Sequence, residues 1–215
     1  MCTAHTAGSS AKKPGPPDPV PLTEESRLRE TLYPYRGGDH GRPILEDYDK
    51  IPIERIVMSR PGLPGTVLRL PMVYGPGDYQ HRLFPYLKRI QDGRTVLLGE
   101  RASRWRTSRG YVEDVADAIV LAATESRAAD EIYNVADVDA LAEADWVRAI
   151  GAEPEIVPDE ELPEDLKDDA WIEQDLVAST GKIRQHLGYS ERVPLEKAIR
   201  TTVEWELKNP PKGGG

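Results

Sequence analysis

The sequence contains a single cysteine, Cys2, so an intramolecular disulfide is excluded. Its four histidines are scattered, without the short spacings of metal ligands, and no metal site is expected. No run approaches eighteen apolar residues, and the N-terminal "MCTAHTAGSSAKKPG" lacks the apolar core of a signal peptide. We therefore expect a soluble, cytoplasmic protein that does not insert into a membrane.

Basic residues are outnumbered, with 28 Lys and Arg against 37 Asp and Glu and a formal net charge of -9. Nucleic acids and anionic membranes are bound through clustered Lys and Arg, so neither is expected as a partner. Only 39% of residues are hydrophobic, and one is Phe. The core should therefore be aliphatic, with Trp and Tyr placed singly.

Proline and glycine divide the 215 residues into three parts. Residues 1–22 are rich in Pro and predict a flexible arm, residues 23–208 predict one domain, and residues 209–215 predict a disordered tail. Apolar patterning within the domain alternates between strand and helix, which indicates the α/β class. The predicted strands are 66–72, 95–99, 104–112, 130–137 and 155–158. The predicted helices are 44–59, with Pro52 at a kink or in a first turn, and 81–93, 113–126, 143–151, 179–189 and 194–209.

Four segments, in order along the chain, resemble motifs of one protein family. They are "YDKIPIER", "LRLPMVYGPGD", "GYVEDVADAIVLA" with "DEIYNVAD", and "TGKIRQHLGYSERVPLEKAIRTTVEWE". The sequence thereby resembles the extended short-chain dehydrogenase/reductases, the NAD-dependent epimerase/dehydratase group, over residues 23–208. The resemblance implies a partial Rossmann-like, doubly wound sheet joined to the family's C-terminal substrate-binding region. It also implies NAD or NADP as cofactor and a small polar, nucleotide-sugar-like substrate.

The glycine-rich fingerprint of dinucleotide binding is absent, since no Gly-x-x-Gly-x-x-Gly pattern occurs. In the family this pattern lies in the first half of the chain, a βαβαβ run of roughly 100 residues at 30 or more per βαβ unit. We therefore interpret the sequence as a truncated form that lacks the dinucleotide-binding half.

The family's catalytic pair is a Tyr and a Lys four residues apart on one helix, where the Tyr exchanges a proton. By resemblance Lys50 is the lysine, in the context of Glu54, but Glu46 stands where the tyrosine is expected. Tyr48 is the available tyrosine, although two residues of helix would place it about 200° around the axis from Lys50. The candidates for catalysis are therefore Tyr48 and Lys50. The alternative is a core aromatic and a surface charge.

The loop after the first strand is the second candidate. By resemblance Pro71, Met72, Val73 and Tyr74 lie along the cofactor, with Met72 in place of a substrate-binding Asn. The alternative is an ordinary β-to-α turn that uses glycine dihedrals.

Three arginines, Arg104, Arg106 and Arg109, are candidates for a substrate diphosphate, because Arg104 and Arg106 would share one face of a strand. The alternative is a solvated basic edge. Asp114 is expected to be structural, in the first turn of its helix. Trp146, Trp171 and Trp205 are expected to be core or interface anchors.

These patterns leave three alternative functions. The first is an NAD(P)-dependent epimerase, dehydratase or reductase, weak or inactive as this chain alone. The second is a non-catalytic accessory module that keeps the substrate half of the fold, and the third is a gene fragment. A homodimer, or a partner chain that covers the exposed sheet edge, is also expected.

Overall fold

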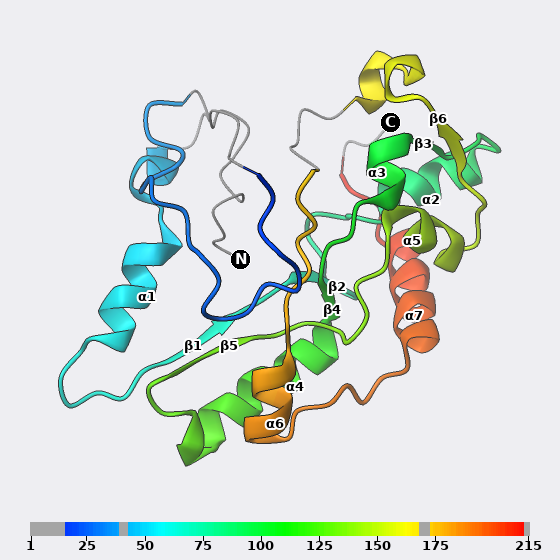
Figure 1. Cartoon of the computed structure of the whole chain (residues 1–215). Helices are drawn as coiled ribbons and strands as arrows, with labels where there is room; N and C mark the ends of the chain where they lie inside the picture. The colour runs from blue at the N-terminus through cyan, green and yellow to red at the C-terminus, as the bar shows by residue number, and fades with distance from the viewer. Residues whose placement is uncertain (1–15, 39–42, 168–172, 213–215) are drawn as a thin grey trace.

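The computed structural model describes residues 16–38, 43–167 and 173–212, which form alternating helices and strands (Figure 1). The α-helices in these ranges are α1 Lys50–Met58, α2 Phe84–Gln91, α3 Glu100–Arg104, α4 Val112–Thr124, α5 Glu143–Ala149, α6 Gly181–Leu187 and α7 Leu195–Lys208. The strands are β1 Thr66–Arg69, β2 Met72–Tyr74, β3 Leu97–Gly99, β4 Arg109–Tyr111, β5 Glu131–Asn134 and β6 Glu155–Val157. Short 3₁₀ turns are η1 Pro43–Asp47, η2 Ser126–Ala128, η3 Asp159–Glu161 and η4 Glu164–Leu166. None of the helices described is both long and apolar enough to cross a membrane.

The strands pair in parallel, β1 with β5, β2 with β4 and β3 with β6. Parallel neighbours require crossover connections, so the predicted α/β class is confirmed. Only Leu70 and Pro71 separate β1 from β2. Proline offers no N–H to a ladder. The extended stretch changes partner at this point, from β5 to β4.

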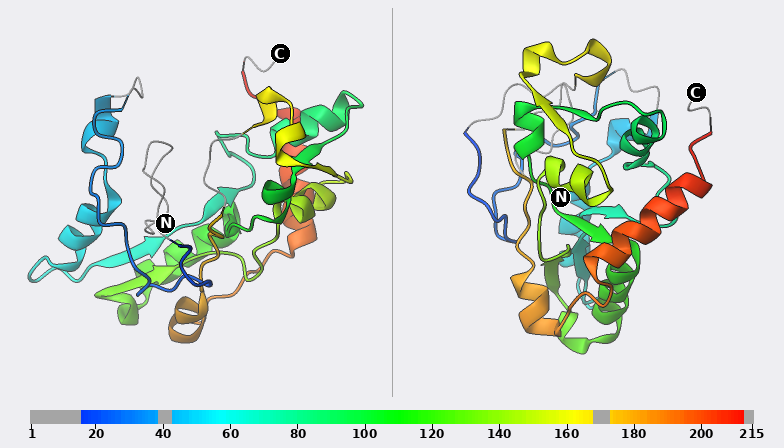
Figure 2. Two further views of the ribbon diagram at one scale, coloured as in Figure 1. Left: turned by 45° about the horizontal axis from the view of Figure 1, so that its top comes forward. Right: turned by 90° about the vertical axis from the view of Figure 1, so that its right-hand side faces the viewer.

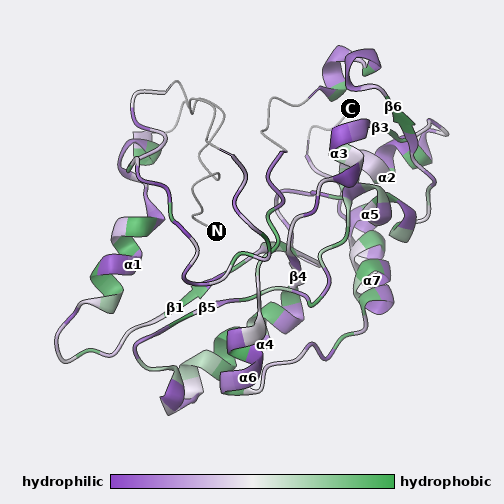
Figure 3. Ribbon diagram, in the orientation of Figure 1, coloured by the Kyte–Doolittle hydropathy of each residue, from purple (hydrophilic) through white to green (hydrophobic). Residues whose placement is uncertain are grey.

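Helices α4 and α6 lie along one side of β1 and β5 (Figures 1 and 2). In the predicted helix 113–126, Val115, Ala118 and Ala122 are buried against Tyr133 of β5. Ile119 of the same helix is 45% exposed. The hydropathy colouring shows apolar residues in β1 and along parts of α4 (Figure 3). This layer is the main core.

A second core cluster joins the end of β2 to the C-terminal helices. Tyr74 packs edge-on against Trp146 of α5, with ring centroids 5.1 Å apart. Leu87 of α2 and Ile199 of α7 complete the cluster. The prediction that Trp146 anchors the core is confirmed, since it is 2% exposed. Trp171 lies outside the described residues.

The region predicted as one helix, 44–59, divides into the 3₁₀ turn η1 and the helix α1. Asp47 ends the turn, and Asp49 caps the helix, because its carboxylate accepts the N–H of Ile51 at 2.9 Å. Pro52 consequently falls in the first turn of α1, where a missing N–H costs no helical hydrogen bond. Tyr48 precedes the helix, so the angle expected between it and Lys50 does not apply.

The prediction of a strand over 104–112 is confirmed in part. Arg104 belongs to the helix α3. Arg106 and Thr107 form isolated bridges with Ala142 and Leu176, and the strand β4 is Arg109–Tyr111. The segment "ERASR" consists mostly of strong helix formers, and Trp105 ends the helix in an extended conformation. Arg104 and Arg106 therefore do not share one face of a strand.

The Pro-rich arm packs at its end. Leu22 is 1% exposed, and its backbone N–H donates to the carbonyl of Val177 at 2.7 Å. The packed part of the chain thus includes at least one residue before 23. Residues 1–15 of the arm and 213–215 of the tail lie outside the described residues.

Candidate functional site

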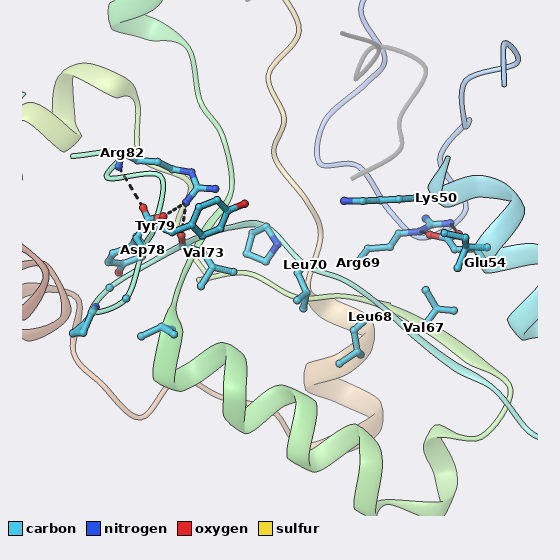
Figure 4. Close-up of a pocket in the computed structure, with 17 residues that line it drawn as sticks. Lys50, Glu54, Val67, Leu68, Arg69, Leu70, Val73, Asp78, Tyr79 and Arg82 are labelled. Carbon is cyan, nitrogen blue, oxygen red and sulfur yellow. Dashed lines mark hydrogen bonds and ion pairs between the residues drawn. The ribbon is translucent and has the colours of Figure 1, made fainter. Parts of the chain in front are cut away.

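A cavity of about 550 Å³ lies between α1, the β1–β2 stretch and the loop that follows β2 (Figure 4). Apolar side chains form its floor, among them Leu68, Leu70 and Val73. Lys50 lines it on the α1 side and Tyr79 on the loop side. In open parallel sheets ligands bind beyond the carboxyl ends of strands. The cavity runs along β1 from Val67 and continues past the carboxyl end of β2 to Tyr79.

The α1 wall is fixed by a bidentate ion pair. Arg69 of β1 donates from Nε and Nη2 to the two carboxylate oxygens of Glu54, at 3.0 and 2.9 Å. Its third nitrogen donates to the carbonyl of Glu24 at 2.9 Å. Arg69 is 9% exposed, so this pairing is shielded from water. The helix therefore has a defined position over the strand.

The start of α1 is fixed as firmly. The buried Asp49 accepts hydrogen bonds from Arg29, from Tyr33 N at 2.6 Å and from Ile51 N at 2.9 Å. Burial acts to raise the pKa of Asp49, but these hydrogen bonds outweigh it and lower the pKa. The next residue is Lys50. Its position at the first turn of the helix is thereby determined.

Lys50 is exposed, and among the described residues its ammonium has no ion pair or hydrogen bond. Figure 4 shows its side chain extended over the cavity, with the nitrogen toward the loop wall. The other cations of the cavity, Arg69 and Arg82, are already paired. Lys50 is therefore the cavity's available charged donor.

The loop wall is organised around Asp78. Its carboxylate accepts from Arg82 Nη1 at 2.6 Å, from Gln80 N at 3.1 Å and from Arg82 N at 3.3 Å. Arg82 also donates to the carbonyl of Val73 at 2.9 Å, which ties the loop back to β2. Gly75 and Gly77 have positive φ, a conformation that favours glycine. The loop is thus a built turn rather than a loose connection.

The same loop is anchored to the C-terminal helix α7. His81 Nδ1 lies 2.7 Å from Glu206, and its ring stacks on Trp205 with centroids 5.5 Å apart. Glu206 is fully buried, and burial raises the pKa of its carboxyl against the opposing effect of His81. His81 itself has a φ of 49°. The helix predicted at 194–209 therefore helps to hold the loop.

Tyr74 separates this cavity from a smaller one of about 250 Å³, since it lines both. Its hydroxyl donates to Asp137 at 3.1 Å. Burial raises the pKa of the Tyr74 phenol, and burial likewise raises the pKa of Asp137 to about 6. Asp114 lines the smaller cavity and accepts from Arg192 N at 2.8 Å, in the structural role expected for it in the first turn of α4.

The structure brings Lys50 and three of the four predicted loop residues to one cavity. Pro71, Val73 and Tyr74 line it, whereas Met72 does not. Tyr48 is also not among the lining residues; it is 38% exposed and its ring lies 6.4 Å from that of Tyr35. Tyr48 therefore fits neither a partner of Lys50 within the cavity nor a core aromatic.

None of the three candidate arginines lines either cavity. Arg109 is 5% exposed, pairs with Glu143 at 2.6 Å and lies over the Trp146 ring, 4.3 Å from its centroid. Arg106 pairs with Asp175 at 2.8 Å, and Arg104 is exposed at the end of α3. A role for them in substrate binding stays a prediction.

The sequence patterns did not single out Tyr79, the Asp78–Arg82 pair or the Arg69–Glu54 pair. The i, i+4 spacing of Asp78 and Arg82 is one signal that could have identified a local ion pair. Tyr79 follows directly after the turn "GPGD", where a large exposed aromatic has no packing reason to be. The Arg69–Glu54 pair joins residues fifteen apart and left no local signal.

The parallel strands, the helices on one face and the cavity that continues past the end of β2 define a Rossmann-like α/β protein of the short-chain dehydrogenase/reductase type. Residues 47–136 match the family described as the NAD dependent epimerase/dehydratase family. The match supports the expected resemblance over these residues.

Two curated proteins illustrate the similarity. The dTDP-glucose 4,6-dehydratase of Salmonella typhimurium is 30% identical over 157 residues, which is 69% of this chain and 42% of that protein. The uncharacterized protein y4nL of Sinorhizobium fredii is 23% identical over 176 residues, 67% of this chain and 48% of that protein. The chain thus spans less than half the length of these relatives.

Solved structures share the fold. WbmG of Bordetella bronchiseptica, in complex with NAD, has a TM-score of 0.65 and 20% identity, over 91% of this chain and 56% of that chain. The UDP-glucose 4-epimerase of Thermotoga maritima, with UDP-glucose, has a TM-score of 0.60 and 23% identity, over 96% of this chain and 62% of that chain. The expected partial Rossmann-like fold is confirmed.

Proposed function

We propose that this chain supplies the substrate-facing part of an NAD(P)-linked site that acts on a nucleotide-sugar-like molecule. One observation carries the proposal: Lys50, the β1–β2 stretch and the loop that follows β2 line the same cavity. Two neighbours of the same fold are described with NAD and with UDP-glucose, which supports this choice of ligands. That the site is enzymatically active in a complete protein is also part of the proposal.

The residues present fit one end of a dinucleotide. Lys50 offers an unpaired ammonium to ribose hydroxyls, and Leu70, Pro71 and Val73 offer an apolar surface to a flat ring. These residues would hold the nicotinamide and its ribose; the nicotinamide, when bound, would exchange hydride with the substrate. The pyrophosphate end has no glycine-rich fingerprint in this sequence. Binding by this chain should therefore be weak.

The test is a calorimetric titration of the purified 215-residue chain with NAD⁺, NADH, NADP⁺, NADPH, UDP and UDP-glucose. We expect saturable binding of at least one dinucleotide between about micromolar and low-millimolar concentration. Lys50→Ala should weaken it about ten- to a hundredfold, because a hydrogen bond from a charged donor contributes roughly 1.5–3 kcal/mol. Lys197→Ala, which removes an exposed lysine of α7 outside the cavity, is the matched control. Absence of binding by a folded sample would refute the proposal.

A non-catalytic binding module is the second candidate. The observation that favours it is the placement of Tyr48, which does not line the cavity with Lys50. A chain that binds both NAD⁺ and UDP-glucose but forms no NADH absorbance and no altered sugar would support this candidate. Measurable turnover, lost in Lys50→Ala, would support the enzyme.

Self-association also stays a proposal. Ile53 and Ile56 of α1 and Leu63 after it are 53%, 62% and 60% exposed. Exposed apolar side chains gathered on one helix favour contact with another surface. Sedimentation velocity of the wild-type chain and of Ile56→Glu would measure it. A monomer at all concentrations would count against a homodimer.

A further inference from the structure

We infer that Tyr79 is a second ligand-binding residue of the large cavity, and that the group held between Tyr79 and Lys50 is a hydroxyl-bearing ring. This inference rests on the proposed function, because it names the ligand group that the same cavity would take. The two side chains come from opposite walls, and in Figure 4 the Tyr79 hydroxyl and the Lys50 nitrogen point toward one another. Two donors thus face the same space.

Tyr79 is exposed although the loop that carries it is held in place. Tyr79 is 82% exposed, yet its neighbours on both sides are held in place. Asp78 binds Arg82 at 2.6 Å, and His81 binds the buried Glu206 at 2.7 Å. A large aromatic in so firmly held a turn gains little stability from remaining in water. Contact with a ligand would explain why an exposed aromatic side chain occupies this turn.

The Tyr79 hydroxyl has its hydrogen available. Gln80 Nε2 donates to the Tyr79 oxygen at 2.9 Å, so the oxygen acts as an acceptor in this bond. A phenol can accept and donate at the same time. The hydroxyl hydrogen can therefore be donated to a ligand oxygen, and the adjacent amide orients it.

The space between the two donors suits a sugar ring. Its floor is apolar, with Leu68, Leu70 and Val73, and would contact the C–H face of a ring. The polar groups stand at the ends, where ring hydroxyls can accept from Lys50 and Tyr79. Both a ribose of a dinucleotide and the hexose of a nucleotide sugar have this chemistry. The experiment separates these two sources.

The experiment measures dissociation constants of NAD⁺, UDP and UDP-glucose for the wild-type chain and for Tyr79→Phe. The phenylalanine keeps the ring and removes only the hydroxyl. We expect about three- to tenfold weaker binding, the usual effect of losing one neutral hydrogen bond. A loss confined to NAD⁺ would assign the ribose. A loss for UDP-glucose without one for UDP would assign the hexose.

A second variant tests the direction of the hydrogen bond. In Gln80→Glu the new carboxylate accepts the hydroxyl hydrogen of Tyr79, which is then no longer available to the ligand. The loss of ligand affinity should therefore match that of Tyr79→Phe. Gln91→Glu, with the same change on an exposed residue at the end of α2, is the control. A structural role of Gln80 alone would change stability without this match in affinity.

The outcomes distinguish the inference from the proposed function. Binding by the wild-type chain with unchanged affinity in Tyr79→Phe would overturn the inference and leave the proposed function intact. The same holds if only Tyr79→Ala weakens binding, because the ring and not the hydroxyl would then make the contact. Absence of binding by the folded wild-type chain would overturn both.

Discussion

Tyr74 donates its hydroxyl hydrogen to Asp137 at 3.1 Å, and this bond joins the end of β2 to the segment after β5. Asp137 also accepts the backbone N–H of Tyr111 at 3.2 Å, at the end of β4. Three chain segments that line the smaller cavity therefore meet at one carboxyl group. Burial raises the pKa of this carboxyl to about 6 from its ordinary value of 3.8.

The first prediction concerns pH and stability. Since the pKa of Asp137 is raised in the folded state, folding favours its protonated form. Its stabilising contribution is present below about pH 4 and is lost as the pH rises to about 6. Relative to Asp137→Asn, the wild-type free energy of unfolding should fall by about 1–3 kcal/mol over this window. Urea unfolding of both proteins at pH 4, 5, 6 and 7 measures the difference.

The control for this prediction is Asp139→Asn, an exposed carboxyl at the same small cavity. Comparing this variant with the wild type shows how much of the pH dependence comes from removing any carboxyl at this cavity. Parallel pH profiles for wild type and Asp137→Asn would show that Asp137 does not have a raised pKa.

The second prediction concerns the anchor between the loop and α7. His81→Ala leaves the buried Glu206 without its 2.7 Å partner, and we expect a loss of about 2–4 kcal/mol in the free energy of unfolding. Glu206→Gln should lower the free energy of unfolding by less, because it also removes the desolvation cost of a buried carboxylate. The double variant should recover part of the His81→Ala loss, with a coupling of about 1–3 kcal/mol. Additive losses in chemical denaturation would contradict the coupling.

Local patterns predicted much of the fold. The helix that buries Val115, Ala118 and Ala122 and the alternation of strands with helices follow from hydrophobic periodicity, which depends on near neighbours. The boundaries were less accurate around α1, where Asp49 caps the helix with contacts to Arg29 and Tyr33, sixteen or more residues away. Such contacts lie outside any local pattern.

The site was predicted in part and for a similar reason. Resemblance identified Lys50 and the loop from Pro71 to Tyr74, and the cavity contains both except for Met72. It did not identify Tyr79, which lines the same cavity as Lys50 because the loop after β2 and the helix α1 form opposite walls. A relation between walls that are 29 positions apart depends on the tertiary fold, and helix spacing cannot reveal it.

The third prediction concerns the two glycines of the cavity loop. Gly75 has a φ of 130°, and a Cβ there would lie 2.6 Å from Val112 Cγ1. Gly77 has a φ of 90°, but a Cβ there would meet nothing within 4 Å. Both alanine variants bear backbone strain of about 1–2 kcal/mol, and only Gly75→Ala adds a steric clash. We expect Gly75→Ala to cost about 2–4 kcal/mol in the free energy of unfolding and Gly77→Ala about half as much.

Val112 provides the decisive control for this prediction. Val112→Ala alone removes part of a half-buried side chain and should cost about 1–2 kcal/mol. Combined with Gly75→Ala it removes the Cγ1 atom that the new Cβ would meet, so the double variant should be more stable than the sum of the single losses predicts. Urea unfolding of the four proteins measures this coupling. Equal losses for the two glycine variants, or strict additivity with Val112→Ala, would show that the loop shifts to accept a side chain at Gly75.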